Sequence, residues 1–378
     1  MALINYTIWT IFILTLSGRP KDHEEYKKLI IGDWTFVKEE SKCKLKPDSI
    51  DNSSFKVGFK SGYKFIESGL CENKLGYFNH ENLSYTQFLG TDTKYRLEDN
   101  RLNIFDLEDD TWKGYEILKL DGNILKLALN DSVNMIFERS NYKLTPGIPF
   151  DQIIVSSSGC LGSCQVNDVM VSRSGEVIFN NEQYTKERGL FSSLISLKQF
   201  DDLEQKFRKA NLKKLKDKYE ASWTDDNEIT ISLIKNGRIF RTIIDYGYQA
   251  PTELYWAYFS VVFLSQKLSL KNLPNEGNFR FQKTFSFEKN DKFIRLAKSE
   301  GFYLANLLNT ANLVDRVFIE KYTLHAAVET GSMKTTTDGR YFKIELENGK
   351  FLTVDLGYNF LHRNNLLKRL SAKMSYEN

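Results

Sequence analysis

Two of the four cysteines in this 378-residue chain stand in one short turn rich in glycine. Cys160 and Cys164 lie four positions apart in the sequence GCLGSC, residues 159–164. Thiols this close together could form a structural disulfide, act as a redox pair, contribute to a metal site, or supply a catalytic nucleophile. Each chemistry requires different neighbours, so the surrounding residues discriminate between them.

The surroundings of the turn favour a structural disulfide. A tetrahedral zinc site needs further ligands, and no other cysteine or histidine lies near in the sequence. Redox pairs usually have two residues between them at the start of a helix, whereas a turn is expected here. A nucleophilic cysteine would need one of four isolated histidines as its base. A turn of this length can bring two Cα atoms within the ~4.4–6.8 Å that a disulfide requires.

Cys43 and Cys71 are candidates for a second disulfide. The loop that they would close contains 29 residues, counting positions 43 through 71. In the chain-entropy model such a bond stabilises the fold by up to about 3.6 kcal/mol, compared with about 2 kcal/mol for the short ring of Cys160 and Cys164. Pairing requires that the strands carrying Cys43 and Cys71 lie side by side, which the sequence leaves open.

A second group of polar residues occurs twice. Residues 224–248 contain Thr-Asp, an alternating segment, Asn-Gly, another alternating segment and Asp-x-Gly-Tyr, and residues 337–358 repeat this order. The matching residues are Thr224, Asp225, Asp245, Gly247 and Tyr248 in the first copy and Thr337, Asp338, Asp355, Gly357 and Tyr358 in the second. Shared order at similar spacing indicates an internal repeat.

The repeated residues have two interpretations. Asp225 and Asp338 could be general acids or cation ligands, and the two Asp-x-Gly-Tyr segments could form a paired site across a pseudo-twofold axis. In the interpretation that the pattern favours, Asp-x-Gly-Tyr ends the second strand of a hairpin, with glycine at a positive φ and tyrosine over the core.

The elements that position these residues begin with a β structure. Alternating apolar and polar segments occur at 34–39, 55–59, 63–68, 84–88, 94–98, 101–105, 114–120, 124–129 and 133–137. About eight to ten short strands, with no helical stretch between them, are typical of an up-and-down barrel. We therefore expect a first domain at residues 29–142.

The segments IGDWTFV (31–37) and MIFERS (135–140) resemble the Gly-x-Trp opening and the closing strand of lipocalin-like domains. The resemblance covers the first domain and implies that Trp34 lies at the closed end of the barrel with Arg139 packed over its indole ring. An eight-stranded barrel has room for packed side chains or one small ligand. The barrel therefore either holds a small apolar molecule or is a filled, stable module.

After a linker at 145–149, the sequence predicts an α+β domain at residues 148–272. Strands at 153–157, 169–172 and 177–180 precede a helix around 200–210, a hairpin at Asn236-Gly237 and a helix at 252–266. The cysteine turn and the later Tyr219, Thr224 and Asp225 make this region similar to a family of bacterial envelope domains of unknown function with the signature Gly-Cys-x-Gly-x-Cys-Pro. Gln165 replaces the proline, and the resemblance implies no activity.

Residues 277–376 are expected to form a third domain, which repeats only the helix–hairpin half of the second. A strand at 279–287 and a helix within 293–309 precede the repeated hairpin. The predicted fold class is therefore multidomain: an all-β lipocalin-like up-and-down barrel, followed by an α+β domain with a partial C-terminal repeat of its helix–hairpin half.

The N-terminal residues predict export. Residues 3–16 are apolar and precede a charged stretch, which is typical of a secretory signal peptide. As a helix they would rise only about 21 Å, so no stable transmembrane span is expected. Arg19 stands where a lipoprotein would carry its lipidated cysteine, so no lipid anchor is expected either. We interpret residues 1–18 as a signal-peptide-like segment that directs the chain to the periplasm or cell envelope.

Composition narrows the function further. A net charge of +3 is small for a nucleic-acid-binding protein, and the isolated histidines argue against a histidine-built metal centre. No metal or other cofactor is expected. The basic stretch 206–218 is interpreted as a solvated helix face.

These observations favour a non-catalytic, exported envelope protein that binds a small apolar ligand or an envelope protein partner. The alternative is an envelope thiol-redox protein or hydrolase that uses Cys160 and Cys164 or the repeated Thr-Asp aspartates. Because no set of convergent catalytic residues is evident, an enzyme is the less favoured interpretation.

Overall fold

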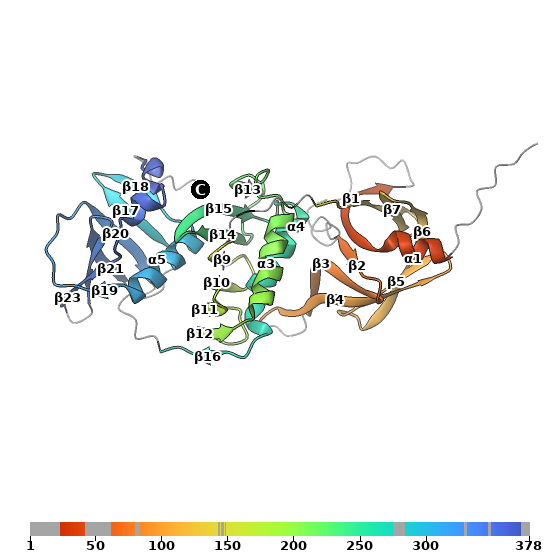
Figure 1. Ribbon diagram of the computed structural model, residues 1–378, viewed down its shortest axis with the longest axis horizontal. Helices are drawn as coiled ribbons and strands as arrows, with labels where there is room; N and C mark the ends of the chain where they lie inside the picture. The colour runs from red at the N-terminus through yellow and green to blue at the C-terminus, as the bar shows by residue number, and fades with distance from the viewer. Residues whose placement is uncertain are drawn as a thin grey trace, which may run out of the picture.

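The computed structural model describes residues 23–41, 62–79, 84–142, 144, 147, 149–274, 284–328, 331–346 and 349–371. Residues 1–18 and Cys43 lie outside these ranges. The described chain forms three β structures in a row with helices between them (Figure 1). The order is a barrel, the helices α3 (Leu197–Lys209) and α4 (Thr252–Val262), a central sheet, helix α5 (Lys298–Thr310) and a C-terminal sheet. The predicted class, a β-barrel followed by α+β structure, is confirmed.

The first β structure is a closed antiparallel barrel, in which β1 pairs with both β2 and β8. Its strands are β1 (Gly32–Ser41), β2 (Tyr63–Phe65), β3 (Leu70–Asn79), β4 (Gln87–Glu98), β5 (Arg101–Asp106), β6 (Thr111–Leu120), β7 (Ile124–Ala128) and β8 (Val133–Arg139). Helix α1 (His23–Ile30) contacts β4 and β6. Apolar side chains such as Leu102, Leu125 and Phe137 are buried in the barrel core.

Strand β3 departs from the sequence prediction, which places no strand at 70–79 and splits β4 into two. The pairing of β3 with β4 shifts register between Glu72 and Tyr77, and Gly76 in this stretch has a φ of +87°. A bulge of this kind breaks the period of two on which strand prediction depends. A Cβ atom at Gly76 would lie 2.3 Å from the Phe88 ring, so the close approach of the strands also requires glycine here.

The central sheet has the strand order β13-β15-β14-β9-β10-β11-β12-β16. The strands are β9 (Gln152–Ser157), β10 (Val166–Ser172), β11 (Glu176–Gln183), β12 (Gly189–Leu194), β13 (Lys218–Glu220), β14 (Glu228–Lys235), β15 (Arg238–Tyr246) and β16 (Lys271–Asn272), and the 3-10 helix η2 (Leu264–Gln266) follows α4. The sequence predicts three strands before α3, but β12 is a fourth. Its adjacent serines and exposed Leu194 give no alternating pattern.

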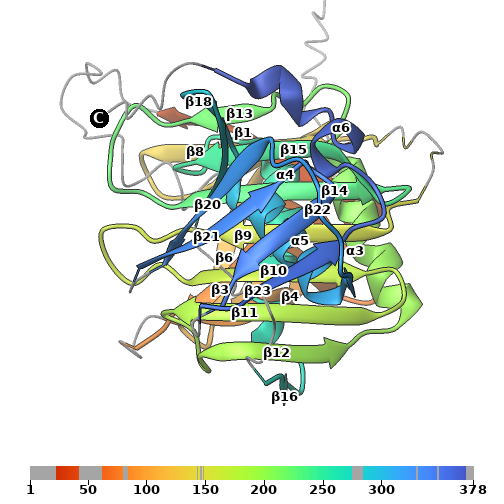
Figure 2. The ribbon, with the colours of Figure 1, turned by 90° about the vertical axis from the view of Figure 1, so that its left-hand side faces the viewer.

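The inner strands of the central sheet are buried on both faces. Ile153 and Val155 of β9 belong to the apolar cluster under α3 and α4, whereas Ile154 belongs to the cluster shared with the C-terminal sheet. Met170 of β10 also lies in this second cluster. Figure 2 shows the C-terminal strands lying in front of the central sheet. Burial on both faces explains why these strands are continuous apolar runs rather than alternating ones.

The face toward α5 also carries polar contacts. The backbone N–H of Ser299 donates to the Thr230 hydroxyl at 2.9 Å. The ammonium group of Lys298 lies 2.7 Å from Glu182 and 3.3 Å from Asp168. The first turn of α5 therefore docks on the sheet through buried polar groups that are paired with one another.

The C-terminal sheet has the strand order β18-β17-β20-β21-β22-β23-β19. Its strands are β17 (Phe285–Lys289), β18 (Lys292–Arg295), β19 (Asn312–Leu313), β20 (Tyr322–Val328), β21 (Gly331–Thr337), β22 (Tyr341–Glu345) and β23 (Phe351–Asp355), followed by α6 (Phe360–Arg363) and η3 (Leu366–Arg369). The repeated hairpins, β14–β15 and β22–β23, have the same antiparallel pairing. The strands β17, β18, β20 and β21 make this region larger than the expected half.

The barrel meets α3 and α4 at a cluster of charged side chains, which we call the barrel junction. Its members are Asp33, Glu72 and Lys74 from the barrel and Lys206, Lys209, Glu253 and Trp256 from the helices. The fully buried Lys74 has its ammonium 3.5 Å from Asp33 and 3.9 Å from Glu253, and it donates to the Tyr142 hydroxyl at 2.8 Å. Burial lowers the pKa of Lys74, although both carboxylates oppose this.

The helices contribute two further ion pairs to the barrel junction. Lys206 lies 3.0 Å from Glu72, and Lys209 lies 3.5 Å from Asp33. Both ammonium groups also lie within 4.9 Å of the centre of the buried Trp256 ring. The expectation of a solvated face is therefore wrong for Lys206 and Lys209, whose side chains are 17% and 16% exposed.

Replacing Lys74 by methionine should destabilise the protein strongly. The variant keeps the length of the side chain but leaves Asp33 and Glu253 short of one cation in a buried site, where breaking an ion pair costs about 3–5 kcal/mol. Urea unfolding followed by tryptophan fluorescence measures this loss. The matched control Lys119→Met removes a lysine that is 56% exposed and pairs with Asp121, and should cost less than about 0.5 kcal/mol. Equal losses in the two variants would contradict the role assigned to the junction.

Candidate functional site

The barrel contains a cavity of about 320 Å³. Its lining residues are Tyr63, Asn73, Leu75, Gly76, Tyr77, Phe78, Ile104, Asp106, Glu108, Lys113, Tyr115, Met135 and Phe137. This volume falls at the lower end of the ~300–1,000 Å³ that is usual for small-molecule sites. The walls come from β2, β3, β5, β6 and β8, so the barrel itself positions the site.

Charged groups of the cavity gather at the turn between β5 and β6. The ammonium of Lys113 lies 2.7 Å from Asp106 and 2.6 Å from Asp109. Glu108 accepts a hydrogen bond from the backbone N–H of Phe78 at 2.8 Å. Burial raises the pKa of Asp106, but Lys113 and two backbone N–H groups outweigh burial and hold this pKa below its ordinary value. The carboxylates of Asp106 and Glu108 and the single ammonium of Lys113 therefore give this side of the cavity a net negative charge.

Aromatic side chains supply both an apolar wall and hydrogen-bond donors. The rings of Tyr63 and Phe137 lie 5.9 Å apart. Burial raises the pKa of Tyr77 and of Tyr115, so both hydroxyls keep their protons at neutral pH. A neutral phenol can donate to a ligand, whereas a phenolate can only accept.

The barrel end beside α1 is closed. The Arg139 guanidinium lies 4.4 Å from the centre of the Trp34 ring and donates to the carbonyl oxygens of Ile31 and Gly122, each at 2.6 Å. The fully buried Trp34 donates from its ring N–H to the Ile30 carbonyl at 2.7 Å. The β5–β6 turn, which carries the charged cavity residues, lies at the opposite end of β6 from Gly122.

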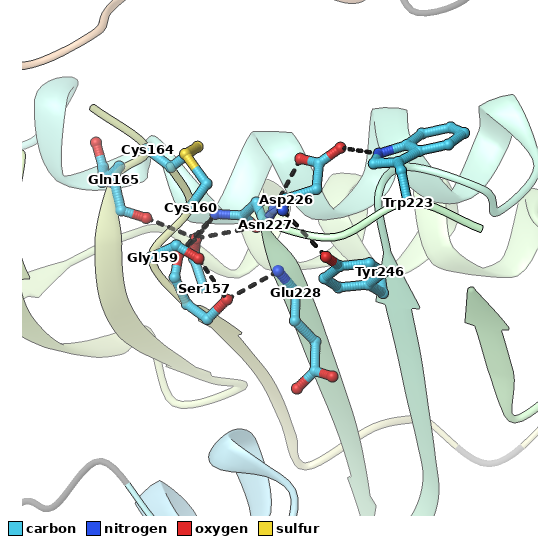
Figure 3. The surroundings of a disulfide bond; sticks show 11 residues. Ser157, Gly159, Cys160, Cys164, Gln165, Trp223, Asp226, Asn227, Glu228 and Tyr246 are labelled. Atoms are coloured by element: carbon cyan, nitrogen blue, oxygen red, sulfur yellow. Dashed lines mark hydrogen bonds between the residues drawn. A yellow bond between two sulfur atoms is a disulfide. The ribbon is translucent and has the colours of Figure 1, made fainter. Parts of the chain in front are cut away.

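The cysteine turn joins β9 to β10 and forms the predicted disulfide (Figure 3). The Cα atoms of Cys160 and Cys164 are 5.7 Å apart. Between them Leu161 is 85% exposed, and its backbone N–H donates to the carbonyl of Asp225 at 2.9 Å. The disulfide therefore constrains an exposed turn rather than facing a cavity.

A buried hydrogen-bonded group ties the cysteine turn to β14. The amide of Asn227, which is 2% exposed, donates to the Ser157 hydroxyl at 3.0 Å and to the Ser158 carbonyl at 2.7 Å. The Ser157 hydroxyl donates in turn to the Gln165 carbonyl at 2.6 Å (Figure 3). These bonds satisfy polar groups that the turn would otherwise leave unpaired in the interior.

Cys71 is buried in the barrel and forms no disulfide with another described residue. Burial, together with the nearby Asp92 and Glu72 carboxylates, raises the pKa of its thiol to about 12. Because the thiolate is the reactive form, a thiol with this pKa is a poor nucleophile at neutral pH. The proposed partner Cys43 lies outside the described residues, so the second disulfide stays a prediction.

In the first copy of the repeat, the buried Asp245 stabilises the turn after β15. It accepts hydrogen bonds from the backbone N–H of Gln249 at 2.8 Å and from the Tyr258 hydroxyl at 2.9 Å. Gly247 and Tyr248 have positive φ values of 68° and 55°. Thr224 and Asp225 lie in an exposed turn before β14.

The second copy is held together differently. Thr337 accepts from the Gly339 N–H at 2.8 Å, and Asp338 accepts from the backbone N–H groups of Arg340 and Tyr341 at 2.8 and 2.9 Å. Asp355 forms an ion pair with Arg340 at 2.7 Å. Gly357 has a φ of +77°, and the Tyr358 ring lies 4.3 Å below the Arg363 guanidinium. These partners lie outside the first copy, and Arg363 in turn donates to the carbonyl of Asn236 in the first hairpin at 2.9 Å.

In the described part of the chain, no group of three or more histidine, cysteine, aspartate or glutamate side chains is arranged to hold a metal ion. Likewise, no helix within the described ranges is long and apolar enough to cross a membrane.

None of the cavity residues is a site predicted from the sequence. For Met135 and Phe137 the sequence does hold an indication. They stand two positions apart in the alternating segment 133–137, so they are expected on the same face of the strand, and both line the cavity. Strand β3 supplies five lining residues, and its bulge removes the pattern that would reveal them.

Comparison with known protein families gives one match. A model described as a domain of unknown function, DUF6438, matches residues 151–264, which include the cysteine turn and the first copy of the repeat. A search of curated proteins finds no match.

Removing the disulfide should lower the free energy of unfolding and leave the structure of the barrel unchanged. For a five-residue ring, the double variant Cys160→Ser/Cys164→Ser should lose about 2 kcal/mol of unfolding free energy. Urea unfolding of the wild type in reductant should reproduce this loss, and Ser163→Ala in the same exposed turn should leave stability unchanged. If reductant has no effect on the wild type, the disulfide does not stabilise the fold.

Proposed function

We propose that this chain is a non-catalytic, exported envelope protein whose barrel binds a small amphipathic molecule. The observation that carries the proposal is the cavity of about 320 Å³, in which Ile104, Met135 and Phe137 share the lining with phenol and carboxylate groups. Cavities that combine an apolar wall with a few polar groups are the usual sites for small organic ligands.

A lipocalin-like identity for the barrel belongs to the same proposal. It is supported by the pairing of β1 with β8, by the sequence around Gly32 and Trp34, and by the packing of Arg139 over the Trp34 ring. The barrel is closed at the end beside α1, and the charged residues of its cavity lie at the opposite end. This arrangement is consistent with a barrel that a ligand enters from one end.

The charges at the β5–β6 turn narrow the ligand class. Asp106 and Glu108 line the cavity together with a single ammonium group among its described residues, that of Lys113, so an anionic ligand would be repelled at this side of the cavity. The ligand that fits has an apolar body and a neutral or positively charged polar group, such as an alkyl or aryl amine.

Export is supported by two observations. The apolar residues 3–16 have the length of a signal-peptide core, and a disulfide such as Cys160–Cys164 persists in oxidising compartments. The thiol-redox or hydrolase alternative has less support. Of the Thr-Asp aspartates, Asp338 accepts hydrogen bonds within its own turn and Asp225 lies in an exposed turn, while the two cysteines are joined in a disulfide.

Titration with the apolar amine N-phenyl-1-naphthylamine, whose fluorescence rises in apolar surroundings, tests the proposal. Met135→Trp should fill the cavity and weaken dye binding at least about tenfold, because the larger side chain occupies the volume of the ligand. The control Leu118→Trp places the same residue at an exposed position of β6 and should change the affinity less than about twofold. Native mass spectrometry of the protein from its source would then identify the natural ligand. Equal binding by the two variants would contradict a ligand in the barrel.

A further inference from the structure

A second hollow, of about 430 Å³, lies outside the barrel, where the end of α3 approaches the β14–β15 hairpin. We call it the basic hollow. Five basic side chains line it: Arg208, Lys209, Lys213, Lys214 and Lys235. No aspartate or glutamate stands among the described residues of its lining.

Three of these five basic groups have no counter-ion among the described residues. Arg208 pairs with Glu204 at 2.7 Å, and Lys209 belongs to the barrel junction. In the described part of the chain Lys213, Lys214 and Lys235 form no ion pair. Burial and the neighbouring Arg208 lower the pKa of Lys235, as expected for an ammonium among like charges.

Backbone acceptors at and beyond the end of helix α3 are hydrogen-bonded. The last carbonyl groups of a helix carry partial negative charge, which would repel an anion. The carbonyl of Arg208, in the last turn of α3, accepts from the backbone N–H of Asn211 at 3.1 Å. Beyond the helix the guanidinium of Arg241 binds the carbonyl oxygens of Leu212 and Leu215, which adds a positive group beside this segment.

One wall of the basic hollow is apolar and flat. Phe240 is 49% exposed, and the ammonium of Lys235 lies 4.1 Å from the centre of its ring. An organic group attached to an anion can therefore lie on Phe240 while the anion faces the lysines.

We propose that the basic hollow binds a multivalent anion of the phosphate type. Three unpaired ammonium groups around one hollow repel one another, and an anion with several charges and acceptor oxygens removes that repulsion more effectively than a monovalent one. Two sources share this chemistry: a soluble phosphate ester and the headgroup of an anionic lipid. The site is separate from the barrel cavity and does not depend on the ligand proposed there.

Isothermal titration of the full chain with pyrophosphate tests the proposal. The variant Lys213→Gln/Lys214→Gln removes two exposed charges and should weaken binding at least about tenfold, which corresponds to about 1.4 kcal/mol. The control Lys27→Gln/Lys198→Gln removes two lysines that are 51% and 86% exposed, and should bind pyrophosphate within about twofold of the wild type. Binding should also weaken as salt is added, because screening acts on exposed charges.

Vesicle flotation separates the two sources. If the natural ligand is a lipid headgroup, the wild type should bind phosphatidylglycerol vesicles but not phosphatidylcholine vesicles, and pyrophosphate should displace it. A soluble ester is indicated when pyrophosphate binds and neither vesicle does. The proposal is overturned if pyrophosphate fails to bind the wild type, or if the two double variants weaken binding equally. Neither double variant alters the barrel cavity, so N-phenyl-1-naphthylamine binding serves as an independent check on folding.

Discussion

The burial of the central sheet on both faces is the constraint on which the rest of the structure depends. Strands β9, β10 and β14 carry apolar side chains on each side, so neither face can be left in water. Helices α3 and α4, backed by the barrel, cover one face, and α5 with the C-terminal sheet covers the other. One cover, α3 and α4, lies within the part of the chain that builds the central sheet, whereas the other, α5 with the C-terminal sheet, follows it in the sequence.

The two layers that cover the central sheet are held to it by different interactions. The side under α3 and α4 is held mainly by packed apolar and aromatic residues, whereas the side under α5 adds buried polar pairs such as Lys298 with Glu182. The barrel is in turn attached to the helices by the ions of the barrel junction. Buried ion pairs contribute little net stability but strongly penalise a wrong partner. They fix how the barrel sits on α3 and α4. Phe78 extends this attachment to the cavity, since its ring lines the cavity and lies 5.4 Å from that of Phe263, just after α4.

The elements that could be predicted are those in which a regular pattern of residues in the sequence corresponds directly to the structure. The closed barrel follows from regular alternation, and the disulfide follows from cysteine spacing and the absence of nearby metal ligands. Strand β3 was hidden by its bulge at Gly76, and β12 by serines at a half-exposed position. The residues of the cavity and of the barrel junction could not be predicted, for a different reason. Lys74 meets Glu253 across 179 positions, which is a property of tertiary packing and leaves no local trace.

The outermost strands of the two open sheets are short. Strand β13 has three residues and β16 and β19 have two each, while β18 is bridged by Ser371. A free sheet edge is a template on which another chain can add a strand through its backbone, and this is how many β-rich proteins begin to aggregate. Two or three residues offer too few hydrogen bonds to hold such an addition. In the described part of the chain the outermost strands therefore offer little backbone on which growth could start. Strand β13 pairs with only the last three residues of β15, and along the remaining edge of β15 the side chain of Asn364 accepts from the Ile239 N–H, which occupies a donor that an added strand would need.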